Sequence, residues 1–402
     1  MKYVPIPVAM LEVGKPLPVN VLSGTGQLLL RKGQPIVSAQ HRDKLHGFNA
    51  STTPADAEAW QRAYERMVHE LLRSGMDVQE IGRAPMPSEI RETDYVVGRQ
   101  FNGGWLDLQD VLRGILYQGG LAINPVQRLA DIQKKAMALV SADADDSLFC
   151  LYQALADDSL GYCATHALLC SVMCELTAGK LGLDAAQRKS LMAAALTMNI
   201  GMARDQDSMA RQGSAINDWQ RGLIRQHPAV SVDILSGFGV DDTDQLDIVR
   251  WHHAPDDPQA DSRNLVGRRL LAMADSFVAR TAARRTRVSE SAMKAVKSMV
   301  LNAQGDALGV GSAMAQTVGF YPPGSYVQLL NGEVAVSVKR GARANMPWVI
   351  SIVDKDGMPV VKYQCKDTSL PGLAIAAPVN FEKIKVVVDP ERVRQARQRI
   401  PA

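Results

Sequence analysis

The chain has no long hydrophobic run, no large excess of one charge and few cysteines, and each absence excludes a class of protein. Nowhere do about eighteen apolar residues follow one another, so we expect no membrane span, and the first residues lack the apolar stretch of a signal peptide. The net charge is +3, from 45 basic and 42 acidic residues, which gives no electrostatic reason to expect binding to a nucleic acid polymer or an anionic membrane. The five cysteines suit reduced thiols in a cytoplasmic protein.

What is present indicates a mainly α protein of two or three domains. Its 402 residues are too many for one small core, and 46% of them are hydrophobic, as in ordinary globular proteins. We expect five regions: a small β-rich module at 1–50, a helical linker or regulatory region at 51–146, a helical domain at 147–317, a β-hairpin extension at 318–388 and a basic tail, a solvated helix, at 389–402.

Local signals place these elements. Val19–Leu22 and Leu28–Leu30 flank a glycine pair and predict an N-terminal hairpin. Asp184 with Gln187, and Asn217 with Gln220, resemble capping boxes at helix starts. Further expectations are helices at Trp60–Leu71, Leu106–Tyr117 and Pro125–Val140, a helix restart at Pro228, and hairpins at Asn331-Gly332 and at Asp356-Gly357, the latter between Val349–Val353 and Val360–Tyr363.

Metal-ligating residue types are few and lie far apart in the sequence. His166 shares a helix face with Cys170 and Cys174. Such a row can ligate a soft metal, but we favour core packing for the two cysteines because Cys is among the most often buried residues.

His252 and His253 end an apolar helical stretch and suit either a polar pocket or a favourable position at a helix C-terminus. Asp275 ends another apolar run, and a buried carboxylate needs a metal or a partner. Its alternatives are an N-cap, or an ion pair with Arg280 or Arg284.

Taken together, these residues resemble the HD-GYP family, the HD-superfamily phosphohydrolases linked to hydrolysis of cyclic di-GMP. The resemblance covers about 150–365 firmly and 1–50 loosely, and it implies an all-helical HD-type domain with a small N-terminal β module and a C-terminal β-hairpin extension. It also implies a possible metal site formed by His166, His227, His252, His253 and Asp275. The matching segments are His166 ahead of Leu181-Gly182-Leu183, Ala193–Gly201, Ile224–Pro228, Ile248–His253, Ala272–Phe277 and Tyr321–Gly324.

The chain departs from the family at positions that carry the family's metal-binding and catalytic residues. Met198 and Asn199 stand where the family has its His-Asp dipeptide, and Met202 replaces a phosphate-contacting lysine, so these three positions are vestigial and no catalytic residue is expected. Tyr162 stands where some members use a glutamate ligand, Val278 replaces a further carboxylate, and no Gly-Tyr-Pro follows His253. Two dications about 3.5–4 Å apart need bridging carboxylates, and among the matched positions Asp275 alone offers a negative charge.

Three hypotheses follow, in order of preference. The first is a catalytically silent signalling scaffold, related to cyclic di-GMP phosphodiesterases, that acts through unknown protein partners or as a homodimer. The second is a phosphohydrolase with a reduced metal site, and the third is a non-hydrolysing binder of a cyclic dinucleotide or other nucleotide. For the third, Arg280 and Arg284 are candidate phosphate contacts, although a solvated helix face is the more common role of such arginines. For all three we expect either no cofactor or one weakly held iron, manganese or zinc ion.

Overall fold

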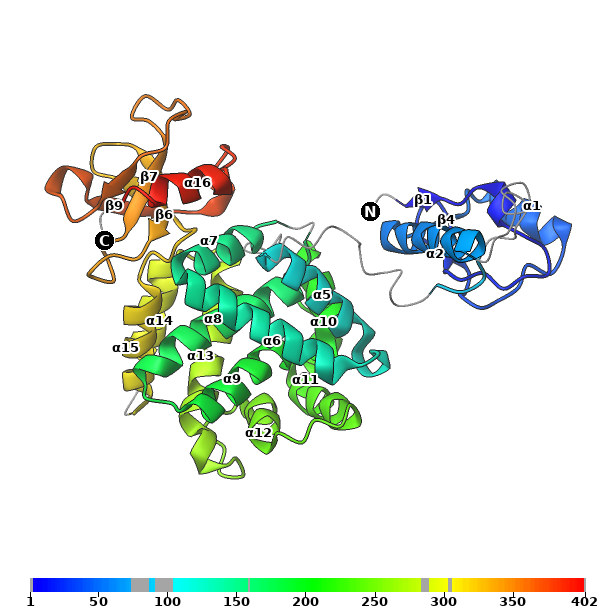
Figure 1. Cartoon of the computed structure of the whole chain (residues 1–402), viewed down its shortest axis with the longest axis horizontal. Helices are drawn as coiled ribbons and strands as arrows, with labels where there is room; N and C mark the ends of the chain where they lie inside the picture. The colour runs from blue at the N-terminus through cyan, green and yellow to red at the C-terminus, as the bar shows by residue number, and fades with distance from the viewer. Residues whose placement is uncertain are drawn as a thin grey trace. The chain divides into compact units, whose positions relative to one another are not determined.

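The computed structural model describes residues 3–73, 87–90, 104–157, 160–282, 289–302 and 306–400. It divides into two compact units, residues 1–101 and 102–402. The division falls inside the region 51–146 that the sequence suggested as one segment. The chain is mainly α with small antiparallel sheets toward both ends, which confirms the predicted fold class (Figure 1). No helix among the described residues has the length and apolar character needed to cross a membrane.

The N-terminal unit is a small sheet with helices. The predicted hairpin is confirmed, since Val21 pairs with Leu30 and Leu22 with Leu28. The helix predicted around Trp60 is also confirmed, and Trp60 is buried in the core of this unit. Its elements are β1 (Val4–Pro5), β2 (Val21–Leu22), β3 (Leu28–Leu30), α1 (Ala39–Gly47), β4 (Ser51–Thr52) and α2 (Pro54–Arg73), with sheet order β1-β4-β2-β3.

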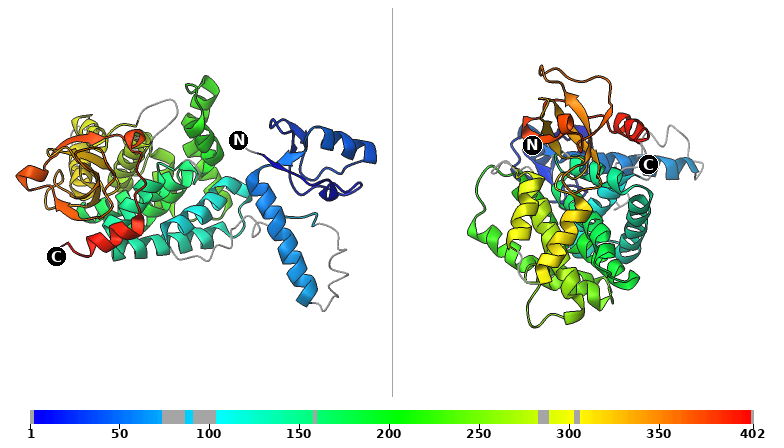
Figure 2. Two further views of the ribbon diagram at one scale, coloured as in Figure 1. Left: turned by 90° about the horizontal axis from the view of Figure 1, so that it is seen from above. Right: turned by 90° about the vertical axis from the view of Figure 1, so that its left-hand side faces the viewer.

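The second unit is a helical body built around α8 (Tyr162–Lys180), and Figure 2 gives two further views of it. Fifteen of the 19 residues of α8 are buried, because helices pack against it on several sides. Cys170 and Cys174 are fully buried there as free thiols, as the core-packing prediction requires. The surrounding helices are α5 (Trp105–Gln118), α6 (Pro125–Ala142), α7 (Ala144–Ala154), α9 (Ala185–Thr197), α10 (Ala203–Arg211), α11 (Asp218–Gly237), α12 (Thr243–Trp251), α13 (Leu265–Thr281), α14 (Ala292–Asn302) and α15 (Asp306–Val318).

Both predicted capping boxes are confirmed. The Asp184 side chain accepts from the Gln187 backbone N–H, and the Gln187 side chain accepts in return from the Asp184 N–H. Asn217 and Gln220 repeat this exchange at the start of α11. Reciprocal capping satisfies backbone donors that a helix start otherwise leaves unpaired. Short-range chemistry therefore sets where α9 and α11 begin.

The C-terminal part of the second unit is a five-stranded sheet of order β8-β7-β6-β5-β9. Alternate residues face two small cores: Val336 and Ile350 lie on one side, Ala335 and Val349 on the other. Period-2 alternation of this kind is what the sequence of these strands indicates. The strands are β5 (Tyr326–Leu329), β6 (Val334–Lys339), β7 (Trp348–Val353), β8 (Cys365–Asp367) and β9 (Ile375–Val379).

The two predicted C-terminal hairpins have different outcomes. The hairpin at Asn331-Gly332 is confirmed, with β5 and β6 antiparallel. The second prediction is only partly right. Pro359 bridges Val353 and the Val360 N–H donates to the Ile352 carbonyl at 2.9 Å, but no strand forms at Val360–Tyr363, and β7 pairs with β8. Proline has no N–H to donate to a ladder, so Pro359 weakens the pairing near the turn.

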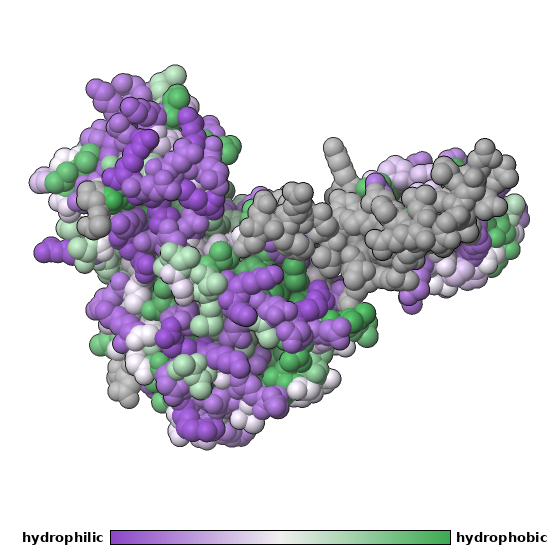
Figure 3. Space-filling model, viewed as in Figure 1, coloured by the Kyte–Doolittle hydropathy of each residue, from purple (hydrophilic) through white to green (hydrophobic). Residues whose placement is uncertain are grey.

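The predicted basic tail is a helix, α16 (Pro390–Arg397), but it is not simply solvated. Its Arg397 contacts Asp143 at 2.7 Å, and Arg394 contacts Asp146 at 3.0 Å. Val393 and Ala396 of α16 are buried against the sheet core. The tail therefore joins α7 to the C-terminal sheet, whose face in Figure 3 is mainly hydrophilic.

Candidate metal centre

His227 is oriented by the proline that follows it. The sequence suggested that Pro228 restarts a helix, but α11 runs unbroken through it. Because proline has no N–H, the carbonyl of Ile224, four residues earlier, lacks its helical donor. The Nδ1 atom of His227 lies 2.7 Å from that carbonyl oxygen and takes the place of the missing donor. The ring is thereby fixed with Nε2 directed away from its own helix.

His252 is oriented in the same way at the end of α12. The last carbonyls of a helix have no partner within the helix, and the Nδ1 of His252 lies 2.7 Å from the carbonyl oxygen of Val249. A carbonyl only accepts, so Nδ1 must carry the proton and, in the neutral ring, Nε2 must carry the lone pair. Both His227 and His252 are therefore Nδ1–H tautomers.

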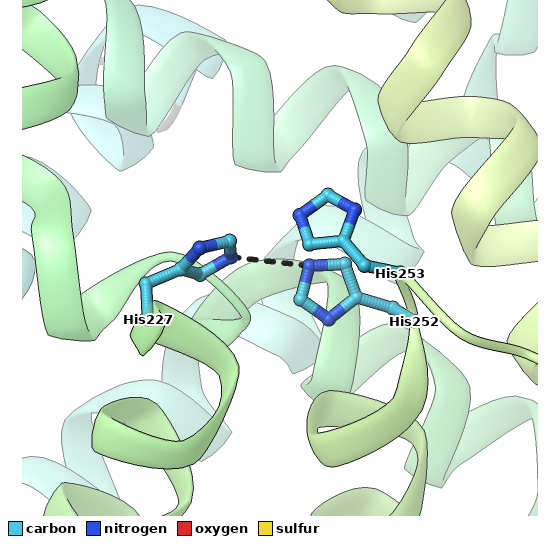
Figure 4. Close-up of side chains that lie close together, drawn as sticks. All are labelled: His227, His252 and His253. Carbon is cyan, nitrogen blue, oxygen red and sulfur yellow. Dashed lines mark hydrogen bonds between the residues drawn. The ribbon is translucent and has the colours of Figure 1, made fainter. Parts of the chain in front are cut away.

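The unprotonated Nε2 atoms of His227 and His252 face each other. The Nε2 atoms of His227 and His252 are 3.2 Å apart (Figure 4). Burial, and then the neighbouring imidazoles, lower the pKa of His227 to about 3 and that of His252 to about 4. Both rings are thus neutral near neutral pH, and no proton is available to join the two nitrogens. Two acceptors at this distance repel unless a cation lies between them.

A single metal ion fits this gap. Two imidazole nitrogens that bind one tetrahedral zinc at about 2.0–2.1 Å are about 3.3 Å apart, close to the observed 3.2 Å. His253 supplies a third nitrogen, since one ligand atom from each of the three histidines falls within 4.8 Å of the others. His253 is exposed, whereas His227 and His252 are buried. The residues present therefore fit one ion with an open side toward solvent.

His166 and Asp275, also predicted as ligands, form a separate pair. Nε2 of His166 lies 2.8 Å from Oδ1 of Asp275, and its Nδ1 lies 2.8 Å from the Tyr162 hydroxyl. Burial raises the pKa of Asp275, but the hydrogen bond from His166 and the nearby imidazoles outweigh burial and bring the pKa well below its usual range. Asp275 is a carboxylate held by His166; among the described residues it is neither an N-cap nor paired with Arg280, and Arg284 lies outside them.

Met198, Asn199 and Met202, the three positions expected to be vestigial, are packed. Met198 is fully buried in the helical core, Asn199 is 2% exposed and Met202 is 7% exposed. The Nδ2 of Asn199 has no hydrogen-bond partner among the described residues. An amide at this position supplies a neutral oxygen and no charge.

Gly201 and Ser231 hold the segment 198–202 against the turn of α11 that bears His227. A Cβ on Gly201 would lie 2.9 Å from the Ser231 backbone nitrogen and 3.0 Å from the His227 carbonyl oxygen. The Ser231 hydroxyl accepts from the Gly201 N–H at 3.0 Å and donates to the Met198 carbonyl at 2.8 Å. We did not predict a role for Ser231, although its spacing of four residues from His227 puts both on one helix face.

Arg268 is a second residue that the sequence did not reveal. It is 2% exposed and pairs with Asp247 at 2.6 Å. Its Nε also donates to the Pro255 carbonyl at 2.9 Å, which holds the segment that follows His253. No spacing rule predicts a buried arginine whose acceptors lie on other segments.

Arg280, suggested as a phosphate contact, already has contacts of its own. Arg280 donates to the Ser298 hydroxyl at 2.8 Å and lies 4.0 Å from a Glu290 oxygen. Arg284 lies outside the described residues.

Replacing Pro228 by alanine is expected to weaken metal binding without weakening the helix. The new N–H competes with His227 for the Ile224 carbonyl and loosens the ring, and loss of such an orienting contact costs about 10–100-fold in metal affinity. Helix stability is expected to rise, because proline inside a helix costs about 3 kcal/mol. Zinc titration against a competing chelator, with thermal unfolding alongside, measures both effects. Pro125→Ala at the start of α6 is the matched control, and an unchanged zinc affinity in Pro228→Ala would contradict the orienting role.

Comparisons with known proteins add little to this geometry. No family model matches the chain, and no curated protein matches it. A solved structure described as Bd1817, a HDG"Y"P protein from Bdellovibrio bacteriovorus, is similar over 78% of this chain and 98% of that chain, with 14% identity and a TM-score of 0.40. A likeness at this score supports no conclusion about fold or activity.

Proposed function

We propose that the second unit is a degenerate HD-GYP-type module that holds at most one divalent ion and acts as a regulatory scaffold. The observation that supports this most is that the described residues offer few anionic oxygens around the histidines. Asp275 is engaged by His166 at 2.8 Å, and Asn199 is an amide where a bridging carboxylate would be needed. Two dications as close as a two-metal hydrolase requires would repel without such a bridge.

The mononuclear site supports a second candidate function. His227, His252 and His253 would hold the ion, and three protein ligands leave a position for water, as in catalytic zinc sites. A bound zinc would supply a Lewis acid and lower the pKa of that water. The chain's own residues would orient the two buried rings through the Ile224 and Val249 carbonyls. A weak phosphodiesterase of this kind is the alternative to a silent scaffold.

Metal content and turnover, measured on the same sample, test the proposal. We expect close to one equivalent of zinc, iron or manganese by elemental analysis after dialysis, and no hydrolysis of cyclic di-GMP above the rate of His253→Ala. His46→Ala, which removes an exposed histidine of α1, is the control and should leave the metal content unchanged. Two equivalents of metal would overturn the proposal. One equivalent with turnover that His253→Ala abolishes would favour the mononuclear enzyme.

The proposal also includes a binding partner for the scaffold. A scaffold needs a protein partner or a second copy, and sedimentation of the purified chain at several concentrations distinguishes a monomer from a homodimer.

A further inference from the structure

A cavity lies in the second unit, where the helical body meets the C-terminal sheet. α7, the end of α13 and the start of α14 contribute to it from the body, and β5, β9 and the turn after β9 contribute from the sheet. Four aromatic side chains line it, those of Tyr152, Tyr321, Tyr326 and Phe381. The predictions from sequence assigned no role to any of them.

Existing contacts occupy two of the tyrosine hydroxyls. Tyr326 donates to the side-chain oxygen of Gln153 at 2.9 Å, and Tyr321 donates to the sulfur of Met293 at 3.2 Å. Burial raises the pKa of Tyr152 and of Tyr326 to about 12, so both remain neutral phenols near neutral pH. What these residues offer a ligand is therefore the face or edge of a ring. Tyr326 and Phe381 lie 5.9 Å apart between ring centroids, with their planes tilted by 54°.

The same cavity is lined by a carboxylate with an unsatisfied oxygen. The Oε2 of Glu290 is buried and has no hydrogen-bond partner among the described residues. Among the described residues, Arg280 is the cation that comes within 4.0 Å of this oxygen, and its Nη1 donates to Ser298. A buried carboxylate oxygen is costly without a donor or a positive charge. Glu290 thus provides negative charge beside the aromatic rings.

The size of the cavity limits what can enter. About 40 Å³ is open to the centre of a water molecule, and one water needs roughly 10–15 Å³ of such space while occupying about 30 Å³ of liquid. The cavity therefore has room for about three waters, or about 90 Å³ of molecular volume. A trimethylammonium group is of this size.

We propose that this cavity binds the quaternary ammonium group of a small organic cation. Aromatic rings attract such a cation through their negative faces, and the Glu290 carboxylate supplies the opposite charge. A quaternary ammonium donates no N–H hydrogen bond, so it suits a wall of rings of which two have their hydroxyls already engaged. The inference is independent of the metal centre and of its proposed function.

Calorimetric titration with choline and with its neutral isostere, 3,3-dimethylbutan-1-ol, tests the proposal. The full chain is used in phosphate buffer without amines, with sodium chloride as the ionic-strength control for choline chloride. We expect choline to bind about tenfold more tightly than the alcohol, because only the cation gains from the rings and from Glu290. Equal affinities would show a merely apolar pocket and overturn the proposal, as would the absence of choline binding.

Two variants test whether the preference for choline arises in this cavity. Glu290→Gln keeps the shape of the side chain and is expected to weaken choline about tenfold while leaving the alcohol unchanged. Tyr321→Phe removes a hydroxyl but keeps the ring, so it should bind choline as the parent does. Circular dichroism confirms that both are folded. If Glu290→Gln binds choline as tightly as the parent, the site is elsewhere and the proposal fails.

A third ligand distinguishes two sources of the same chemistry. A tripeptide with a central trimethyllysine is titrated beside choline. Tighter binding of the tripeptide would indicate a methylated lysine side chain of another protein, and tighter binding of choline would indicate a free metabolite. Either result supports a quaternary ammonium site.

Discussion

The double variant Met198→His/Asn199→Asp is expected to raise the metal content from about one equivalent to two. The introduced aspartate would add the bridging carboxylate that two nearby dications need, and the introduced histidine would replace a thioether that is a poor ligand for zinc, iron or manganese. Elemental analysis after dialysis measures the change, and the electron paramagnetic resonance of a manganese-loaded sample would show coupling between two ions.

The double substitution is expected to reduce the stability of the fold, and the controls are chosen to separate this effect from metal binding. Met198 is fully buried, so a histidine there destabilises the core unless a metal engages it. Asn199→Asp alone adds the charge without disturbing Met198 and is expected to tighten the first ion without adding a second. Met198→Leu conserves volume and should leave the metal content at about one. If the double variant folds, as circular dichroism can verify, and still holds one ion, the electrostatic account of the parent site is wrong.

Removing His227 is expected to have the largest effect on affinity for the single ion. Zinc held by four protein ligands in small peptides gains about 10–16 kcal/mol, so one ligand accounts for about 3 kcal/mol, or about a hundredfold in affinity. His227→Ala should therefore weaken zinc by about a hundredfold or more in a competition assay against a chelator.

His166→Ala is the control for the His227→Ala result. His166 is likewise a buried histidine of the helical body, but both of its ring nitrogens are engaged, by Tyr162 and by Asp275. We expect His166→Ala to weaken zinc much less than His227→Ala does. Equal losses in the two variants would show that His166 ligates the ion, and the division of the five predicted ligands into a trio and a separate pair would be wrong.

Much of the fold could be predicted from signals between residues close together in the sequence. The capping boxes at Asp184 and Asn217 set two helix starts, and Asn331-Gly332 set one hairpin, because these signals act within a few residues. Pro228 misled for the opposite reason. Whether proline breaks an element depends on what else meets the freed carbonyl or the missing donor, and at Pro228 it is the His227 ring.

The sequence by itself determined the inventory: seven histidines, an amide and a thioether at 198–199, and the helices that bear them. Only the tertiary structure decided which ligands meet. His227 and His252 are 25 positions apart, yet their lone pairs face each other at 3.2 Å, while His166 turns to Asp275, 109 positions away. Side-chain periodicity fixes a residue's face on its own helix, but the direction of a ring nitrogen and the partner it finds depend on how helices pack, and packing is a property of the whole core.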